Sequence, residues 1–164
     1  MKPVLKTLAL SALIAASGAH AQEVVRHGAG DFPISSAVEV PAGKTLVYLS
    51  GTVPSVIDAQ AAKDSLAAFG DTKAQTIDVL EQIQRQLKTL GLGLEDVVKM
   101  QAFLVGGPEH GGVMDFDGFM AGYTQFFGAA AGQSHLPARS AFQVAGLAHP
   151  AWRVEIEVIA VRPE

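Results

Sequence analysis

Two segments near the end of the chain alternate between residue types, and this pattern restricts the fold more than any other feature. Residues 137–145 and 152–161 each read as a β-strand, because successive side chains of a strand point to opposite faces. We expect an antiparallel hairpin that turns near Leu147–Pro150 and brings Arg139 close to Glu155 and Glu157. In the first strand, one face would carry Arg139, Ala141, Gln143 and Ala145, and the other Ser140, Phe142 and Val144. In the second strand, one face would carry Val154, Ile156 and Val158, and the other Arg153, Glu155 and Glu157.

An arginine beside a glutamate on a rigid sheet has two readings. Arginine grips a carboxylate with two parallel N–H groups, and a partly buried glutamate can accept and return a proton. The pair would then bind a small acid and act on it. The other reading is a cross-strand ion pair, which contributes little when it is exposed. The alternation alone leaves both open.

The rest of the chain predicts two helices and further strands. A helix begins at a Thr72–Gln75 capping box, carries one apolar face and stops at Gly91. A second helix begins at Asp115, carries an aromatic face typical of a core and ends before Gly128. Strands are expected at residues 35–40, 45–50 and 95–105, with an irregular segment at 22–33. Two helices on one sheet indicate an α+β two-layer fold, with residues 22–164 as a single domain.

The first 21 residues have the three parts of a secretory signal peptide. Lys2 and Lys6 make the start of the chain basic, and an apolar run follows. Ala19-His20-Ala21 is then an A-x-A cleavage site before Gln22. We therefore expect a periplasmic or secreted protein, with no membrane span after cleavage. Removal of both lysines would leave ten basic against 16 acidic residues. Such an acidic protein is a poor non-specific partner for nucleic acids.

Several kinds of site find no support in the sequence. Cysteine is absent, which excludes thiolate chemistry and disulfides. The histidines of the mature chain show no metal-ligand spacing, so the sequence predicts no metal site. Gly106–Gly112 is rich in glycine but lacks the Lys-Ser/Thr ending of a phosphate-binding loop. We interpret it as a flexible connection.

The C-terminal segments also resemble a known family. Pro137-Ala138-Arg139-Ser140 and Val154-Glu155-Ile156-Glu157, with Ser50-Gly51 at a strand end, are similar to motifs of the RidA/YjgF family of enamine/imine deaminases. The similarity extends over about residues 33–161. It implies a chorismate-mutase-like α+β fold, one mixed sheet with two helices, and a homotrimer with clefts between subunits.

The resemblance also implies an activity and a set of site residues. Arg139 would bind the carboxylate of a small 2-enamine or 2-imino acid, with Ala138 beside it. Glu155, rather than Glu157, would support water attack, while Ser50 and Gly51 would line the cleft. The products would be a 2-keto acid and ammonia, with no metal or cofactor.

Two substitutions depart from the family pattern. Ile34 stands where the family has the tyrosine of a Gly-Pro-Tyr motif, and Met120 falls where an asparagine is common. Both make the expected cleft more apolar and favour a larger, more hydrophobic substrate. They also leave open a second function besides the deaminase, a non-catalytic trimer that binds a small carboxylate or aromatic ligand. A third alternative is a protein that binds other proteins through apolar surface.

Overall fold

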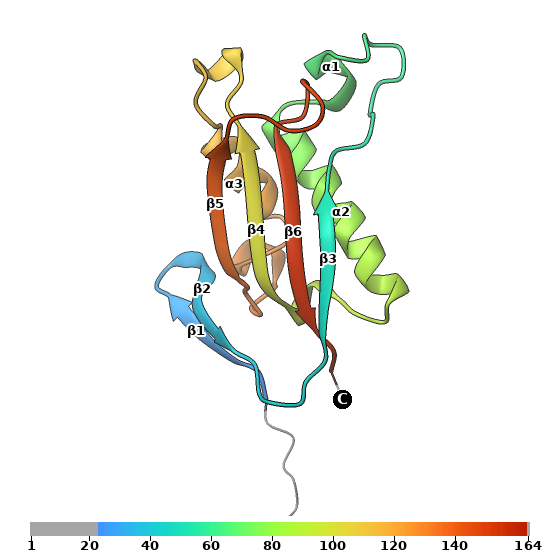
Figure 1. Cartoon of the computed structure of the whole chain (residues 1–164). Helices are drawn as coiled ribbons and strands as arrows, with labels where there is room; N and C mark the ends of the chain where they lie inside the picture. The colour runs from blue at the N-terminus through green and yellow to red at the C-terminus, as the bar shows by residue number, and fades with distance from the viewer. Residues whose placement is uncertain (1–22, 164) are drawn as a thin grey trace, which may run out of the picture.

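The computed structural model describes residues 23–163, and within them six strands form one mixed sheet. The spatial order of the strands is β1-β2-β5-β4-β6-β3, and the helices α2 and α3 cover one face (Figure 1). The other face is not covered by any helix of the described chain (Figure 1). The predicted two-layer α+β fold is therefore confirmed. The predicted signal peptide, residues 1–21, lies outside the described residues.

The elements follow in the chain as strands separated by two substantial helices. Short 3-10 turns lie at Leu94–Asp96, Pro108–His110 and Ala129–Ala131. The helices are α1 (Leu66–Phe69), α2 (Thr72–Thr89) and α3 (Phe116–Tyr123). The strands are β1 (Val25–Ala29), β2 (Phe32–Glu39), β3 (Leu46–Thr52), β4 (Val97–Val105), β5 (Ala138–Val144) and β6 (Val154–Val161).

The predicted hairpin of the last two strands is wrong. Strand β5 pairs in parallel with β4, and β6 pairs antiparallel with the other edge of β4, so β4 separates them. The connection at residues 145–153 therefore passes over the end of β4 rather than making a tight turn. Its end packs beneath α1, where Ala151 is buried together with Phe69. The two strands are thus separated by β4 despite their closeness in sequence.

The N-terminal segment is more regular than its composition indicates. Residues 25–29 form β1, which pairs antiparallel with β2 through a bulged register near Gly28. Strand β2 is consequently not at the edge of the sheet, and its other side meets β5 at Ser35 and Ala138. The side chain of Arg26 fastens β1 to the domain, because it donates to the backbone oxygens of Glu95, Val97 and Leu136.

Helix α2 follows the expected periodicity but begins differently. Asp71 is the N-cap and accepts a hydrogen bond from the Ala74 amide, so the predicted Thr72 capping box is wrong. Gln75 is instead fully buried. Its amide nitrogen donates to the oxygens of Gly70 and Ala151, and its oxygen accepts from the Arg153 amide. The apolar stripe packs against the sheet through Val79, Leu80, Ile83 and Leu87.

Helix α3 begins as predicted, with the Asp115 side chain accepting from the Gly118 amide. Phe119 and Tyr123 face the core and are fully buried. Helices α2 and α3 approach closely at Gly122, where a Cβ would lie 2.7 Å from Cβ of Thr76. The close contact fixes how α3 lies on the sheet, and therefore where its side chains meet β5.

Candidate functional site

Arg139 lies on β5 with its side chain on the helix-covered side of the sheet. Its partner in β4 is Met100, which is fully buried on that side. Three aromatic rings surround the guanidinium, and their centroids lie 4.3, 5.1 and 5.4 Å from its Cζ atom. They belong to Tyr123, Phe119 and Phe32 respectively. Cations are attracted to aromatic faces at these distances, so the rings hold the guanidinium in place.

The acceptors that the described chain offers to Arg139 are all neutral. One guanidinium nitrogen lies 3.3 Å from the sulfur of Met120, a weak acceptor. The Tyr123 hydroxyl also interacts with the guanidinium, and it donates its own proton to the Pro33 oxygen. Within residues 23–163 no carboxylate forms an ion pair with Arg139. A partly buried cation is thus left without a counter-charge.

Burial changes the acid–base behaviour of this group and its neighbour. Desolvation lowers the pKa of Arg139 from its ordinary value, and the nearby Tyr123 partly opposes this. Burial raises the pKa of Tyr123 to about 12, although the Arg139 charge works against the rise. Tyr123 is therefore a neutral phenol at ordinary pH, and it cannot neutralise the guanidinium.

The other residues expected near Arg139 lie on three elements. Met120 on α3 contacts the guanidinium directly. Ile34 on β2 packs against the core cluster that also includes Phe119 and Tyr123. Ala138 is partly buried at the start of β5. The sequence did not single out Phe32, Phe119 and Tyr123 for this site, and the helical spacing of Phe119 and Tyr123 indicates core alone.

Glu155 lies on the uncovered side of the sheet. It belongs to β6, whose Val154, Ile156 and Val158 are buried on the opposite side. Gly51 sits directly beside it, because a Cβ at Gly51 would collide with Oε1 of Glu155. Ser50 and Gly51 lie in a bulge of β3, where the pairing with β6 shifts between Leu49 and Thr52. The structure thus brings Ser50, Gly51 and Glu155 together.

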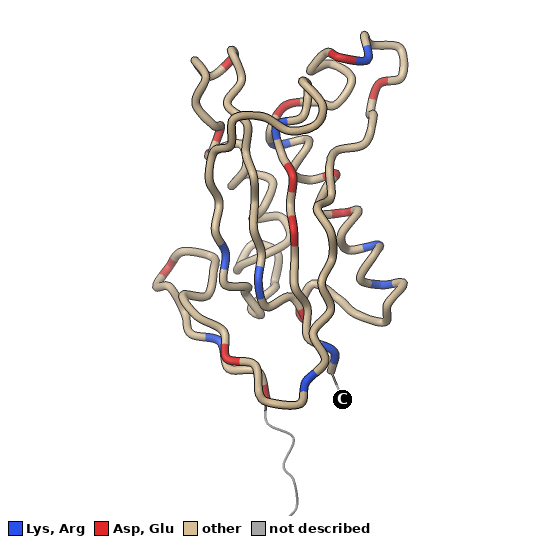
Figure 2. The backbone as a smooth tube through the Cα atoms, viewed as in Figure 1, with Lys and Arg blue, Asp and Glu red and all other residues tan. Residues whose placement is uncertain are grey.

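Arg139 and Glu155 do not meet within one chain, contrary to the hairpin prediction. Their cross-strand partners in β4 are Met100 and Phe103, which face opposite sides of the sheet. Along the strands, acidic positions lie midway along β6 and basic ones towards the lower ends of β4 and β5 (Figure 2). The predicted residues therefore form two separate groups, an arginine group and a glutamate group.

A different arginine–glutamate pair is present at the upper end of the sheet. Nε of Arg153 lies 2.6 Å from Oε1 of Glu109, and a terminal nitrogen lies 3.4 Å from Oε2. Hydrogen bonding to Arg153 lowers the pKa of the Glu109 carboxyl. Gly106–Gly112 is thereby attached to β6, and Gln143 on β5 also donates to the Gly112 oxygen. The sequence missed this pair because the partners lie 44 positions apart.

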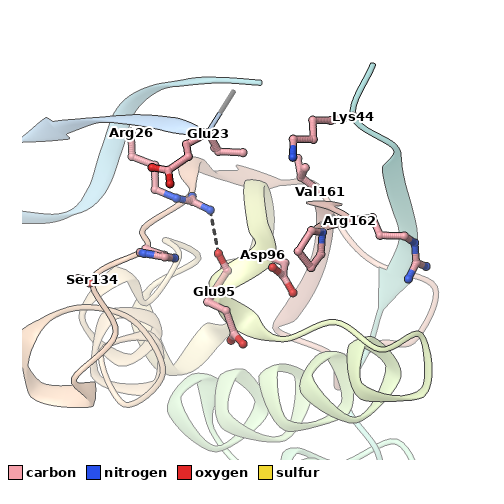
Figure 3. Close-up of a pocket in the computed structure, with 11 residues that line it drawn as sticks. Glu23, Arg26, Lys44, Glu95, Asp96, Ser134, Val161 and Arg162 are labelled. Atoms are coloured by element: carbon pink, nitrogen blue, oxygen red, sulfur yellow. Dashed lines mark hydrogen bonds between the residues drawn. The ribbon is translucent and has the colours of Figure 1, made fainter. Parts of the chain in front are cut away.

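One hollow of the described chain contains none of the expected site residues. Its volume is about 690 Å³, and Figure 3 shows Arg26, Lys44, Glu95, Asp96 and Arg162 among its lining. Arg26 donates hydrogen bonds to backbone oxygens, and Arg162 donates one to the Leu90 oxygen. Both cations therefore have structural roles at this end of the molecule.

Within residues 23–163, no group of three or more histidine, cysteine, aspartate or glutamate side chains comes together in a way that could hold a metal ion. No helix in this part of the chain is long and apolar enough to cross a membrane.

Comparison with known proteins places this fold in a family. The family model described as Endoribonuclease L-PSP matches residues 29–162. A YjgF-family protein from Neisseria meningitidis is 28% identical, with a TM-score of 0.53 over 88% of this chain and 99% of its own. The YjgF gene product of E. coli is 27% identical, with a TM-score of 0.55 over 84% and 94%. TdcF of E. coli, solved with bound serine, is 28% identical with the same score and coverage.

These similarities extend over nearly the whole described chain. Hydrolytic enzyme activity is associated with the family, and trimers are typical of it. The matched residues include every element of the sheet except most of β1, which begins at Val25. The chain therefore belongs to the Endoribonuclease L-PSP family, the family of the YjgF/RidA proteins.

Proposed function

We propose that this protein hydrolyses 2-enamine or 2-imino acids to 2-keto acids and ammonia. The observation that carries the proposal is the state of Arg139. Its guanidinium is partly buried, held by three aromatic rings, and has only a thioether and a phenol as acceptors. A carboxylate with two oxygens would supply the missing counter-charge in the geometry that arginine prefers.

The reaction consumes one water molecule and releases one ammonia molecule. An enamine first tautomerises to the imine, and water then adds to the imine carbon. The resulting carbinolamine loses ammonia and leaves the carbonyl group of the keto acid. Arg139 would fix the carboxylate beside the reacting carbon, and Glu155 would accept a proton from water and return it to the departing nitrogen.

We further propose that each site is shared between two subunits of a homotrimer. Arg139 and Glu155 lie on opposite sides of the sheet, so a site that contains both needs two chains. The uncovered sheet face supports such an assembly, because Tyr48 is 68% exposed and Phe142 is 40% exposed there. Apolar residues at this exposure are typical of interaction surfaces.

The remaining expected residues fit roles around this cleft. Gly51 leaves room for the Glu155 carboxylate, since any larger residue would displace it. Ser50 lies next to it in the same bulge and would line the glutamate side. Ile34, Met120 and Ala138 would line the arginine side.

The test is hydrolysis of imino acids generated in place by an amino-acid oxidase, followed by ammonia release. We expect Arg139→Ala and Glu155→Gln each to lower kcat/KM by about 100-fold or more. Arg85→Ala is the matched control, because Arg85 is an exposed helix arginine whose ion pair within residues 23–163 is with Glu81. Unchanged turnover in Arg139→Ala would contradict the proposal.

Mixed assembly tests whether the site is shared. Arg139→Ala and Glu155→Gln chains would be unfolded together in equal amounts and refolded. In a ring in which one subunit gives the arginine and its neighbour the glutamate, about a quarter of the clefts would be intact. Recovery to about a quarter of wild-type activity is expected. If the mixture stayed as inactive as the separate variants, the shared site would be refuted.

A non-catalytic trimer that binds a small carboxylate is the second candidate. The Met120 contact favours it, because a thioether replaces a stronger hydrogen-bonding group beside Arg139. The serine bound to TdcF is an amino acid held by a relative of this chain. Binding of keto acids without turnover of any imino acid would decide for this candidate.

We also propose that the protein is exported, on the basis of residues 1–21. The test is N-terminal sequencing of the protein recovered from a bacterial host after release of the periplasmic contents. A mature chain that begins at Gln22 is expected. Recovery of the chain with Met1 intact, and in the cytoplasm alone, would refute export.

A further inference from the structure

The apolar surroundings of Arg139 also bear on which acids the site accepts. We propose that the site prefers 2-imino acids with large apolar side chains, such as those derived from leucine, methionine or phenylalanine, over those with small or polar ones. This inference rests on the proposed function, because it uses the same arginine as the carboxylate anchor.

The accessible surface beside the guanidinium is apolar. Phe32 is 42% exposed, and its ring lies 5.4 Å from the guanidinium carbon. Met120 is partly buried and contacts the guanidinium from α3. Phe119 and Tyr123 lie beneath them and are fully buried. A carbon chain that extends from a carboxylate on Arg139 would therefore run along Phe32 and Met120.

The same surface offers little to a polar side chain. The polar atoms in contact with Arg139 are the Met120 sulfur, a weak acceptor, and the Tyr123 hydroxyl, whose proton is already donated to the Pro33 oxygen. Ile34 adds another apolar side chain from β2. On this side of the cleft a substrate hydroxyl or amide would lose its water without gaining a partner from the chain that carries Arg139, which disfavours binding.

The surroundings also explain why a carboxylate anchor is compatible with apolar selection. Rings and thioether exclude water from the guanidinium, and a charged pair is stronger where water is excluded. A small acid would pair its carboxylate with Arg139 and leave the Phe32 ring exposed, whereas a large apolar acid would also cover that ring. Differences of a few methylene groups in such pockets correspond to about tenfold or more in binding.

The experiment measures binding of keto-acid products by calorimetry, together with turnover of the matching imino acids. Phenylpyruvate and 4-methyl-2-oxopentanoate would be compared with pyruvate on the full mature protein. We expect the two apolar acids to bind at least about tenfold more tightly than pyruvate. Phe32→Ser and Met120→Asn should each reduce that ratio at least about threefold, while Val113→Ser, an exposed apolar control directly after the glycine-rich segment, should not.

The outcomes separate this inference from the proposed function. Pyruvate binding as tightly as phenylpyruvate, with imino acids still hydrolysed, would overturn the inference and leave the function standing. Preferential binding of apolar keto acids without turnover would support the inference and refute the deaminase. If no keto acid bound and none of the imino acids was hydrolysed, both would fall.

Discussion

Replacement of Glu109 by glutamine should destabilise the fold by removing the counter-charge of Arg153. The Arg153 side chain is only 9% exposed, and Glu109 is 31% exposed. Loss of one partner from a fully buried pair costs about 3–5 kcal/mol. Because water reaches Glu109, and Arg153 keeps its bond to the Pro150 oxygen, we expect a smaller loss of about 2 kcal/mol. That loss corresponds to a fall in Tm of about 4–8 °C.

The assay is urea unfolding of the mature protein, followed by circular dichroism. Glu81→Gln is the matched control, because Glu81 forms an exposed pair with Arg85 at 3.7 Å on α2. We expect that control to change the free energy of unfolding by less than about 0.5 kcal/mol. The double variant Glu109→Gln/Arg153→Met should be more stable than the sum of the single changes indicates, because it leaves no unpaired charge.

The deficit should also depend on pH in a defined direction. Arg153 lowers the folded-state pKa of Glu109 below its ordinary value of 4.5. The pair therefore contributes its stability fully above pH 4.5 and loses it as the pH falls through the lowered folded-state value. The difference between wild type and Glu109→Gln should shrink below pH 4.5. A deficit under about 0.5 kcal/mol at pH 7, or one that grows in acid, would refute the reasoning.

Two further predictions concern α3. Gly122→Ala should lower the free energy of unfolding by about 1–3 kcal/mol, because its Cβ would meet Thr76. Gly146→Ala, whose Cβ meets no atom within 4 Å, should leave it nearly unchanged in the same urea titration, and equal effects would contradict this packing argument. In a Tyr48→Phe background Tyr123 is the remaining tyrosine, and its phenolate absorbance should appear with a midpoint near pH 12. Full ionisation by pH 10.5 would show that the ring is not buried.

The sequence predicted elements better than it predicted their neighbours. Apolar spacing located α2, and Asp115 located the start of α3, because both signals lie within a few residues. Strand pairing depends on contacts distant in sequence. The hairpin prediction failed because alternation in β5 and β6 is compatible with any neighbour, including β4.

The placement of Arg139 and Glu155 failed for a related reason. Alternation within β6 correctly separates Glu155 from the buried Val154 and Ile156. In β5 the more apolar face contains Phe142, yet Phe142 is exposed and Arg139 lies on the helix side. Aromatic rings of α3 make that possible, and only the folded chain shows that they surround the guanidinium.

The position of β6 has a consequence for how the chain assembles during synthesis. Strand β3 pairs with β6, and β6 in turn joins it to β4, although β3 ends about 100 positions before β6 begins. Until Val154–Val161 leave the ribosome, β3 has no strand beside it in the described part of the sheet. Contacts so distant in sequence form late and slowly. In a nascent chain that stops before Val154, β3 is therefore separated from the other strands of the sheet. The eight-residue strand β6 completes the sheet by pairing with both β4 and β3.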